Sequence, residues 1–286
     1  LMSPHNTPGL YEAFGTEDFD DLYEKYEDDK SIPKKVVKAQ DLFFDLLKER
    51  AETGRIYIMN IDHCNTHSSF KDKISMSNLC QEITLPTTPI QHIDDPKGEI
   101  ALCILSAINV GTLNDISELE NLCDISVRAL DQIIDYQRYP VKAAEVSTKA
   151  RRSLGIGYIG LAHYLAKNGV KYSDPKAWEL VDRLSEAFQY YLLRTSCNLA
   201  EEKGKCEKFD RTKYADGKLP IDHYKKDIDK ILPHKQRMAW ESLRKDIAKH
   251  GLRHSTLSAQ MPSESSSVVS NETNGIEPPR ALLSIK

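Results

Sequence analysis

The sequence predicts an α/β fold whose strands are mostly parallel. Short runs of β-branched and aromatic residues alternate with longer stretches in which apolar residues recur at helical spacing. This alternation favours parallel strands linked by helices, and no internal repeat or low-complexity linker interrupts it. We therefore expect one α/β unit over residues 1–286, with its chemistry at the carboxyl ends of strands, where such folds bind ligands.

The first sixty residues are expected to form two helices and then a strand. Apolar residues recur at helical spacing over 17–53, with a break near Ile32 and Pro33. Gly54 fits a helix C-terminal cap, and residues 55–62 are a β-branched and aromatic run of strand length.

The remaining elements follow in the same alternating pattern. Strands are predicted at 79–85, 100–105, 154–159 and 252–259. Helices are predicted over about 115–136, from the end of the strand at 154–159 to about 167, and over about 175–203. A polar, charged stretch covers 204–235, and a further helix is predicted before Gly251.

Composition excludes several classes of protein. The net charge is -4 and the sequence pI is about 6.2, so there is no broad cationic field for nucleic-acid phosphates. The longest nearly uninterrupted apolar run, Ile100–Val110, is too short to span a bilayer, and the N-terminus lacks a signal-peptide pattern. We expect a cytoplasmic protein that binds neither nucleic acid nor membranes.

Six cysteines are widely spaced and include no CxxC pair, unlike a secreted disulfide framework. In a reducing compartment we expect one or two of them to be chemical and the rest to be small buried hydrophobes. They are Cys64, Cys80, Cys103, Cys123, Cys197 and Cys206.

The segment Ser77–Leu85, SNLCQEITL, carries the strongest chemical signal. If it is extended, Asn78, Cys80 and Glu82 project to one side, because side chains alternate along a strand. Such a trio can perform hydrogen-atom chemistry on a sugar, with Cys80 as the radical sulfur, Glu82 as general base on a hydroxyl, and Asn78 holding that hydroxyl. The alternative is an ordinary half-buried strand with a core-facing cysteine, and the segment by itself leaves both open.

A second candidate site is the serine-rich run Met261–Ser267, MPSESSS, which follows a predicted strand. Small hydroxylic residues at a helix start present N–H and O–H donors to an anion, so a diphosphate would fit there. Simple N-capping of the helix by serine is the alternative.

Five collinear motifs resemble the class I ribonucleotide reductase large subunit, over essentially the whole chain. They are SNLCQEITLPT, GEIALCILSAINVG, RRSLGIGYIG, GLRHSTLSAQMPSESS and SNETNGIEPPR. The resemblance implies that residues 1–286 are a partial catalytic domain, part of a ten-stranded α/β barrel with a finger loop at its centre. A cobalamin-dependent relative would share the cysteine and the carboxylate, but the NLC and PSESSS segments are more similar to class I.

The resemblance also implies roles for single residues. Cys80 is similar to the thiyl radical that abstracts the 3′-hydrogen of the ribose, Glu82 to the base that takes the 3′-hydroxyl proton, and Asn78 to its hydrogen-bonding partner. Cys103 is similar to one of two redox-active cysteines that reduce the substrate and end as a disulfide; its partner is expected N-terminal to Leu1. The implied substrate-binding residues are Asn78, Leu79, Cys80, Gln81, Glu82, Pro262, Ser263, Glu264, Ser265 and Ser266.

The implied reaction reduces ribonucleoside diphosphates to deoxyribonucleotides, with electrons from thioredoxin or glutaredoxin. The resemblance implies no cofactor or metal in this segment, a radical supplied by a metal-containing, di-iron or similar, small subunit, and ATP or deoxynucleotide effector sites in the upstream remainder of the large subunit. Tyrosines that relay the radical and tail cysteines are expected beyond Lys286. Alone, the segment should be inactive; a non-catalytic nucleotide-binding or assembly piece is the alternative.

Two further patterns are interpreted as structural. Gly155, Gly157 and Gly160 match a dinucleotide fingerprint, but in the resembled family this stretch belongs to a barrel strand. The HCNTH run, residues 63–67, lacks a second ligand pair nearby and is expected to be loop rather than a metal site.

Overall fold

The computed structural model describes residues 1–233 and 235–281. Its sheet consists of two parallel strands, β1 (Ile104–Asn109) and β2 (Leu154–Ile159), which pair in register from Ile104 opposite Leu154 to Asn109 opposite Ile159. The α/β class with parallel pairing is confirmed. Over the described residues the sheet is open, so a closed ten-stranded barrel stays an expectation.

Ten α-helices are described around this sheet, together with five short 3-10 helices. The α-helices are α1 (Leu10–Ala13), α2 (Asp18–Asp28), α3 (Ala39–Thr53), α4 (Ile61–His67), α5 (Glu118–Tyr136), α6 (Lys142–Arg151), α7 (Leu161–Lys167), α8 (Pro175–Lys203), α9 (Trp240–His250) and α10 (Glu264–Val269). The 3-10 helices are Pro4–Asn6, Phe209–Arg211, Lys213–Asp216, Pro220–Asp222 and Lys226–Lys230.

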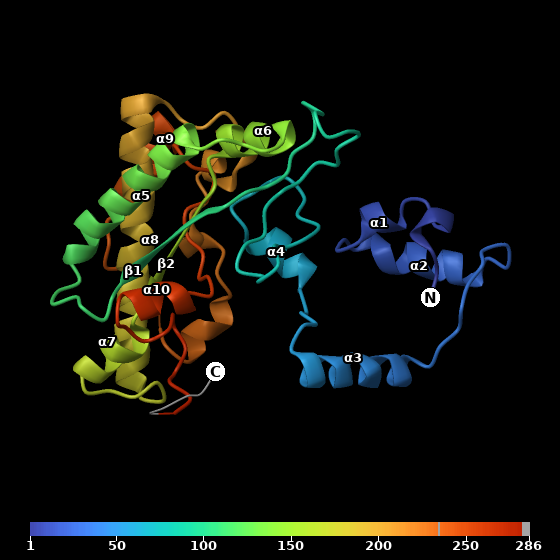
Figure 1. Ribbon diagram of the computed structural model, residues 1–286, viewed down its shortest axis with the longest axis horizontal. Helices are drawn as coiled ribbons and strands as arrows, with labels where there is room; N and C mark the ends of the chain where they lie inside the picture. The colour runs from blue at the N-terminus through green and yellow to red at the C-terminus, as the bar shows by residue number, and fades with distance from the viewer. Residues whose placement is uncertain (234, 282–286) are drawn as a thin grey trace.

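The hydrophobic core lies between the sheet and the long helices. Helix α5 packs on both β1 and α8, and Figure 1 shows these two helices beside the strands. The α5 residues Leu119, Cys123 and Val127 recur at helical spacing and are fully buried. This packing fixes one face of the sheet and leaves the other face free to carry a site.

A further segment runs along the second edge of β2. The backbone N–H groups of Leu154 and Ile156 donate to the carbonyls of Thr256 and Leu257, and Ala259 N–H donates to the Ile156 carbonyl. Only one parallel bridge, between Ile156 and Ser258, is regular. The strand predicted at 252–259 is therefore reduced to an irregular parallel segment that leads into α10.

The N-terminal part is loosely attached. Figure 1 shows α1, α2 and α3 apart from the body that contains the sheet. Helix α3 buries none of its residues, although Leu42, Phe43, Phe44 and Leu47 are apolar. Gly54 ends α3 in the left-handed conformation, which confirms the predicted C-terminal cap.

Several predicted elements are wrong in kind or extent. Residues 55–60 form no strand, and α4 begins at Ile61. The strand expected at 100–105 instead begins at Ile104 and runs to Asn109, and α6 was not predicted. These segments are short, and their conformation depends on tertiary neighbours more than on local propensity.

No helix in the described part of the chain is long and apolar enough to cross a membrane.

Candidate active site at the 78–83 turn

The segment that carries Cys80 is a tight turn. The Asn78 N–H donates to the Ile83 carbonyl, the Ile83 N–H donates to Asn78 Oδ1 at 3.2 Å, and the Gln81 N–H donates to the Asn78 carbonyl. Gln81 has a φ of 60°, in the left-handed region that side chains other than glycine rarely adopt. The side chain of Asn78 thus closes the turn with its own oxygen.

This turn corrects the strand predicted at 79–85. A reversal at Gln81 breaks the two-residue alternation that would have aligned Asn78, Cys80 and Glu82 on one face. Cys80 and Leu79 lie exposed at the tip, whereas Glu82 is half-buried on the returning arm. The three side chains share a turn rather than a strand face.

The returning arm brings Glu82 to Cys103, which lies just before β1. Burial, followed by the negative charge of Glu82, raises the pKa of the Cys103 thiol to about 12. At neutral pH this sulfur therefore keeps its hydrogen, whereas Cys80 is open to solvent at the tip. The structure brings together a carboxylate and a protonated thiol that are 21 positions apart in sequence.

A small apolar cluster anchors the same region. Phe70, Ile74 and Leu85 form its buried centre, and Ile83 and Cys103 pack against it. Because both arms of the turn contribute to one cluster, the returning arm is held next to the entry into β1.

The close approach of Cys103 to the sheet requires a glycine. A Cβ atom at Gly155 in β2 would lie 2.6 Å from Cys103 Sγ, and one at Gly157 would lie 2.5 Å from the Ala259 carbonyl oxygen. Gly160 adopts a φ of 82° at the start of α7. The GxGxxG spacing thus lets a thiol and a neighbouring backbone approach β2 closely.

Arg151, at the end of α6, ties the two flanks of the turn together. Its guanidinium donates to Asp72 at 2.9 Å and to Glu99 at 2.6 Å, and all three side chains are largely buried. Asp72 precedes the turn and Glu99 precedes Cys103, so one arginine fixes both ends of the segment that carries the candidate residues. Sequence reasoning missed Arg151, because its partners are 52 and 79 residues away.

The serine-rich segment follows the irregular segment that runs beside β2. Gln260 exchanges two hydrogen bonds with the backbone of Tyr158 and so fixes this segment to the strand. Ser263 is buried at the start of α10, and its Oγ has no hydrogen-bond partner among the described residues. Pro262 and the residues 264–266 are exposed.

That geometry does not support simple capping of the helix. Ser263 occupies the N-cap position but its side chain makes no capping hydrogen bond, so its buried hydroxyl remains available to a ligand. The preceding segment reaches the turn, because Ser258 and Glu82 line one cavity.

The HCNTH run forms most of α4 rather than the loop that was expected. His63 and His67 lie one helical turn apart with their rings 5.7 Å from each other. In the described ranges, 1–233 and 235–281, no group of three or more histidine, cysteine or acidic side chains is arranged to hold a metal ion.

The structure thus holds a protonated Cys103 thiol near the charge of Glu82, and an exposed Cys80 thiol two positions before Glu82. All of residues 1–286 match the family described as ribonucleotide reductase, barrel domain, and the chain belongs to that family.

Relatives carry corresponding names. The chain is 59% identical to the ribonucleoside-diphosphate reductase subunit alpha of Haemophilus influenzae, 56% identical to the ribonucleoside-diphosphate reductase 1 subunit alpha of Escherichia coli, and 45% identical to the ribonucleoside-diphosphate reductase subunit alpha of Enterobacteria phage T4. Each match covers 100% of this chain and 38% of the relative. The chain thus spans well under half the length of these relatives.

Proposed function

We propose that this chain is part of the catalytic barrel of a class I ribonucleotide reductase large subunit, which reduces ribonucleoside diphosphates to 2′-deoxyribonucleoside diphosphates. The observation that carries the proposal is that burial and the nearby charge of Glu82 keep the Cys103 thiol protonated, while Cys80, on the same turn as Glu82, is exposed. Family membership over all 286 residues supports it.

In this proposal each residue has one task. Cys80, at the tip of a finger-like turn, becomes the thiyl radical and takes the 3′-hydrogen of the ribose. Glu82 accepts the 3′-hydroxyl proton as general base. Cys103 delivers reducing equivalents and is oxidised to a disulfide with a cysteine of the upstream remainder. The high pKa of Cys103 suits a group that gives up hydrogen rather than one that attacks as a thiolate.

Binding of the substrate diphosphate is assigned to Pro262–Ser266. The unpartnered, buried Ser263 hydroxyl and the N-terminal N–H groups of α10 offer donors to phosphate oxygens. Asn78, Leu79 and Gln81 complete the binding residues around the turn. The remaining strands of a ten-stranded barrel would come from the rest of the large subunit.

The proposed reaction needs components beyond this chain. We propose a small subunit that carries a metal centre as the source of the radical, thioredoxin or glutaredoxin as the reductant, and nucleotide effectors that bind the rest of the large subunit. A cytoplasmic location suits the six free thiols.

The decisive test is Cys80→Ser in the full-length large subunit with its small subunit. Serine cannot form the thiyl radical, so reduction of ribonucleoside diphosphates should fall to background. The matched control is Cys197→Ala, which changes a buried thiol of α8 and should keep most of the activity. Undiminished turnover by Cys80→Ser would remove Cys80 from its assigned role.

A further inference from the structure

A cavity with both polar and apolar lining borders Glu82. Its volume is about 380 Å³, and it lies between the arm that carries Glu82 and the stretch that contains the short helices Lys213–Asp216 and Pro220–Asp222. Tyr214 contributes from the first of these helices, His223 directly follows the second, and Ser258 contributes from the segment beside β2. The cavity is large enough for several water molecules.

Two buried polar atoms of this cavity's lining residues are without partners. Glu82 Oε2 and His223 Nε2 are each inaccessible to solvent, and neither has a hydrogen-bond partner among the described residues. Leaving such an atom unsatisfied costs about 1–3 kcal/mol. Both residues line one cavity, so a water molecule that reached both atoms would satisfy them, because water both donates and accepts hydrogen bonds.

Glu82 connects this cavity with the candidate redox site. Its carboxylate lines the cavity and is close enough to Cys103 to raise the pKa of that thiol. Glu82 is therefore near both the candidate redox site and the cavity that His223 also lines.

We propose that His223 is a relay residue that exchanges protons with Glu82 through water in this cavity. The inference rests on the proposed function and deepens it. Glu82 takes a hydroxyl proton and becomes neutral; it passes that proton to a water molecule, which gives another to His223 Nε2. Glu82 is again a carboxylate, His223 is an imidazolium, and the reverse transfer returns the proton when the substrate hydroxyl needs it.

The surroundings of His223 suit a neutral proton acceptor. Burial, followed by the positive charge of Lys213, lowers the pKa of His223. His67 and Lys218 act in the same direction and Asp222 opposes them, while Tyr214 and Tyr224 line the same cavity. At neutral pH His223 is therefore mostly unprotonated and can receive a proton.

The test compares His223→Ala and His223→Gln in the full-length reductase with its small subunit. We expect kcat to fall by on the order of 10-fold, KM for the nucleotide to stay within about twofold, and the acidic limb of the kcat–pH profile to change. Added imidazole should restore kcat of His223→Ala but not that of His223→Gln, because only alanine leaves room for it. The matched control is His250→Gln on α9, outside the cavity, which should retain the original profile.

The outcomes separate the relay from the proposed function. If the unmodified enzyme reduces ribonucleotides and Cys80→Ser does not, the function stands regardless of His223. The relay is overturned if both His223 variants keep the original kcat and pH profile, or if imidazole raises kcat of His223→Ala no more than that of the His250→Gln control. Should His223→Ala fail to fold, the pH profile of His223→Gln decides between the same two results.

Discussion

At the scale of single residues, the proposed chemistry depends on how burial and Glu82 affect the Cys103 thiol. Burial is the larger cause of the high pKa of Cys103, and the charge of Glu82 adds to it. The thiol is thereby kept protonated, as a hydrogen donor requires. Cys80, two residues before Glu82, escapes burial because the turn at Gln81 projects it outward.

A charge-removing substitution tests this coupling. Glu82→Gln should lower the pKa of Cys103 while leaving it above that of an exposed thiol, since burial persists. Alkylation of Cys103 at a fixed alkaline pH should then become faster, because more thiolate is present. Mass spectrometry of labelled peptides measures the rate, with Glu49→Gln on the exposed helix α3 as control. An unchanged Cys103 rate would mean that the two groups are not coupled.

At the scale of elements, the turn depends on a link to α6. Arg151 joins Asp72 to Glu99, while Arg211 also pairs with Asp72 and Lys208 lies 3.9 Å from Glu99. The two carboxylates flank the segment that contains the turn, and Cys103 follows shortly after Glu99. Helix α6 therefore positions the candidate site without contributing a side chain to it.

Removing this arginine should be costly. Arg151→Met leaves two largely buried carboxylates short of a partner, and we expect a loss of about 3 kcal/mol in the free energy of unfolding, with faster proteolysis between residues 72 and 99. The control is Arg128→Met, whose ion pairs with Asp124 and Glu202 are solvent-exposed and should contribute less than about 1 kcal/mol. Denaturant unfolding measures both. Equal losses in the two variants would refute the positioning role of Arg151.

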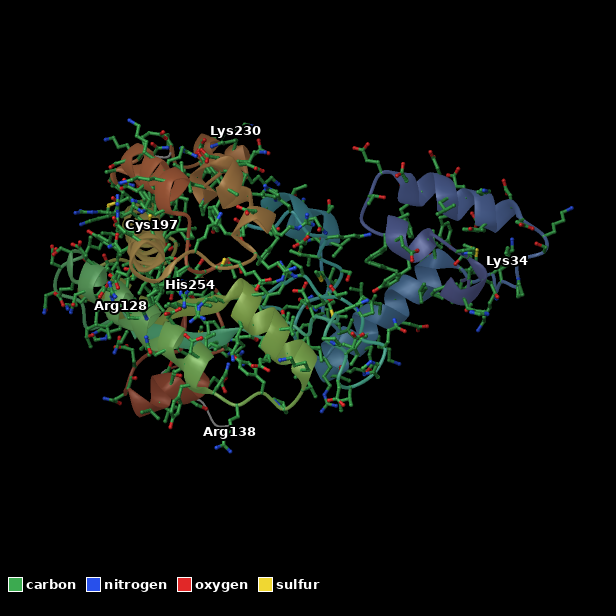
Figure 2. The ribbon with its side chains drawn as sticks, turned by 90° about the horizontal axis from the view of Figure 1, so that it is seen from above. Lys34, Arg128, Arg138, Cys197, Lys230 and His254 are labelled. Carbon is green, nitrogen blue, oxygen red and sulfur yellow. The ribbon has the colours of Figure 1, made fainter. Side chains whose placement is uncertain are left out.

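At the scale of the whole molecule, a buried ionic network connects elements that are far apart in sequence. Asp131 of α5 has no exposed surface and lies within 3.2 Å of Arg152, Lys203, Arg253 and His254. Figure 2 shows His254 in the interior, whereas Arg128 lies at the outside of α5. The network joins α5, α8, the start of β2 and the segment that leads to α10.

His254 makes the stability of this network depend on pH. Complete burial, only partly offset by Asp131, lowers its pKa to about 4 from an ordinary value of 6.5. His254 Nε2 lies 3.2 Å from Asp131 Oδ1. Between about pH 6.5 and 4, His254 is therefore protonated in the unfolded chain but neutral in the folded chain.

The sign of the effect follows from that difference. The contribution of His254 to the free energy of unfolding is fully present above pH 6.5. It falls by up to about 3 kcal/mol as the pH decreases toward 4. His254→Asn should flatten the fall in unfolding free energy over this range, whereas His250→Asn on α9 should not. Denaturant titrations at several pH values measure the slope. An equally steep slope in His254→Asn would exclude His254 as its source.

Local sequence patterns were enough to predict several features that depend on nearby residues. The core spacing of Leu119, Cys123 and Val127, the cap at Gly54 and the glycine-rich strand β2 were all predictable, because neighbouring residues decide them. The collinear motifs also predicted the family that the comparison with known proteins shows.

Residue type and short-range spacing were enough to predict the α/β class and the family, and they also yielded the candidate site residues, whose roles remain proposals. Only the tertiary structure decided that Asn78, Cys80 and Glu82 lie on a turn, that Glu82 meets Cys103, and that Arg151 holds the flanks. These features depend on the left-handed backbone of Gln81, on Gly155, whose lack of a Cβ leaves room for Cys103 Sγ, and on ion pairs that span 52 and 79 positions. Contacts over such separations cannot be predicted from a local sequence pattern, because they are stabilised by residues that are distant in sequence.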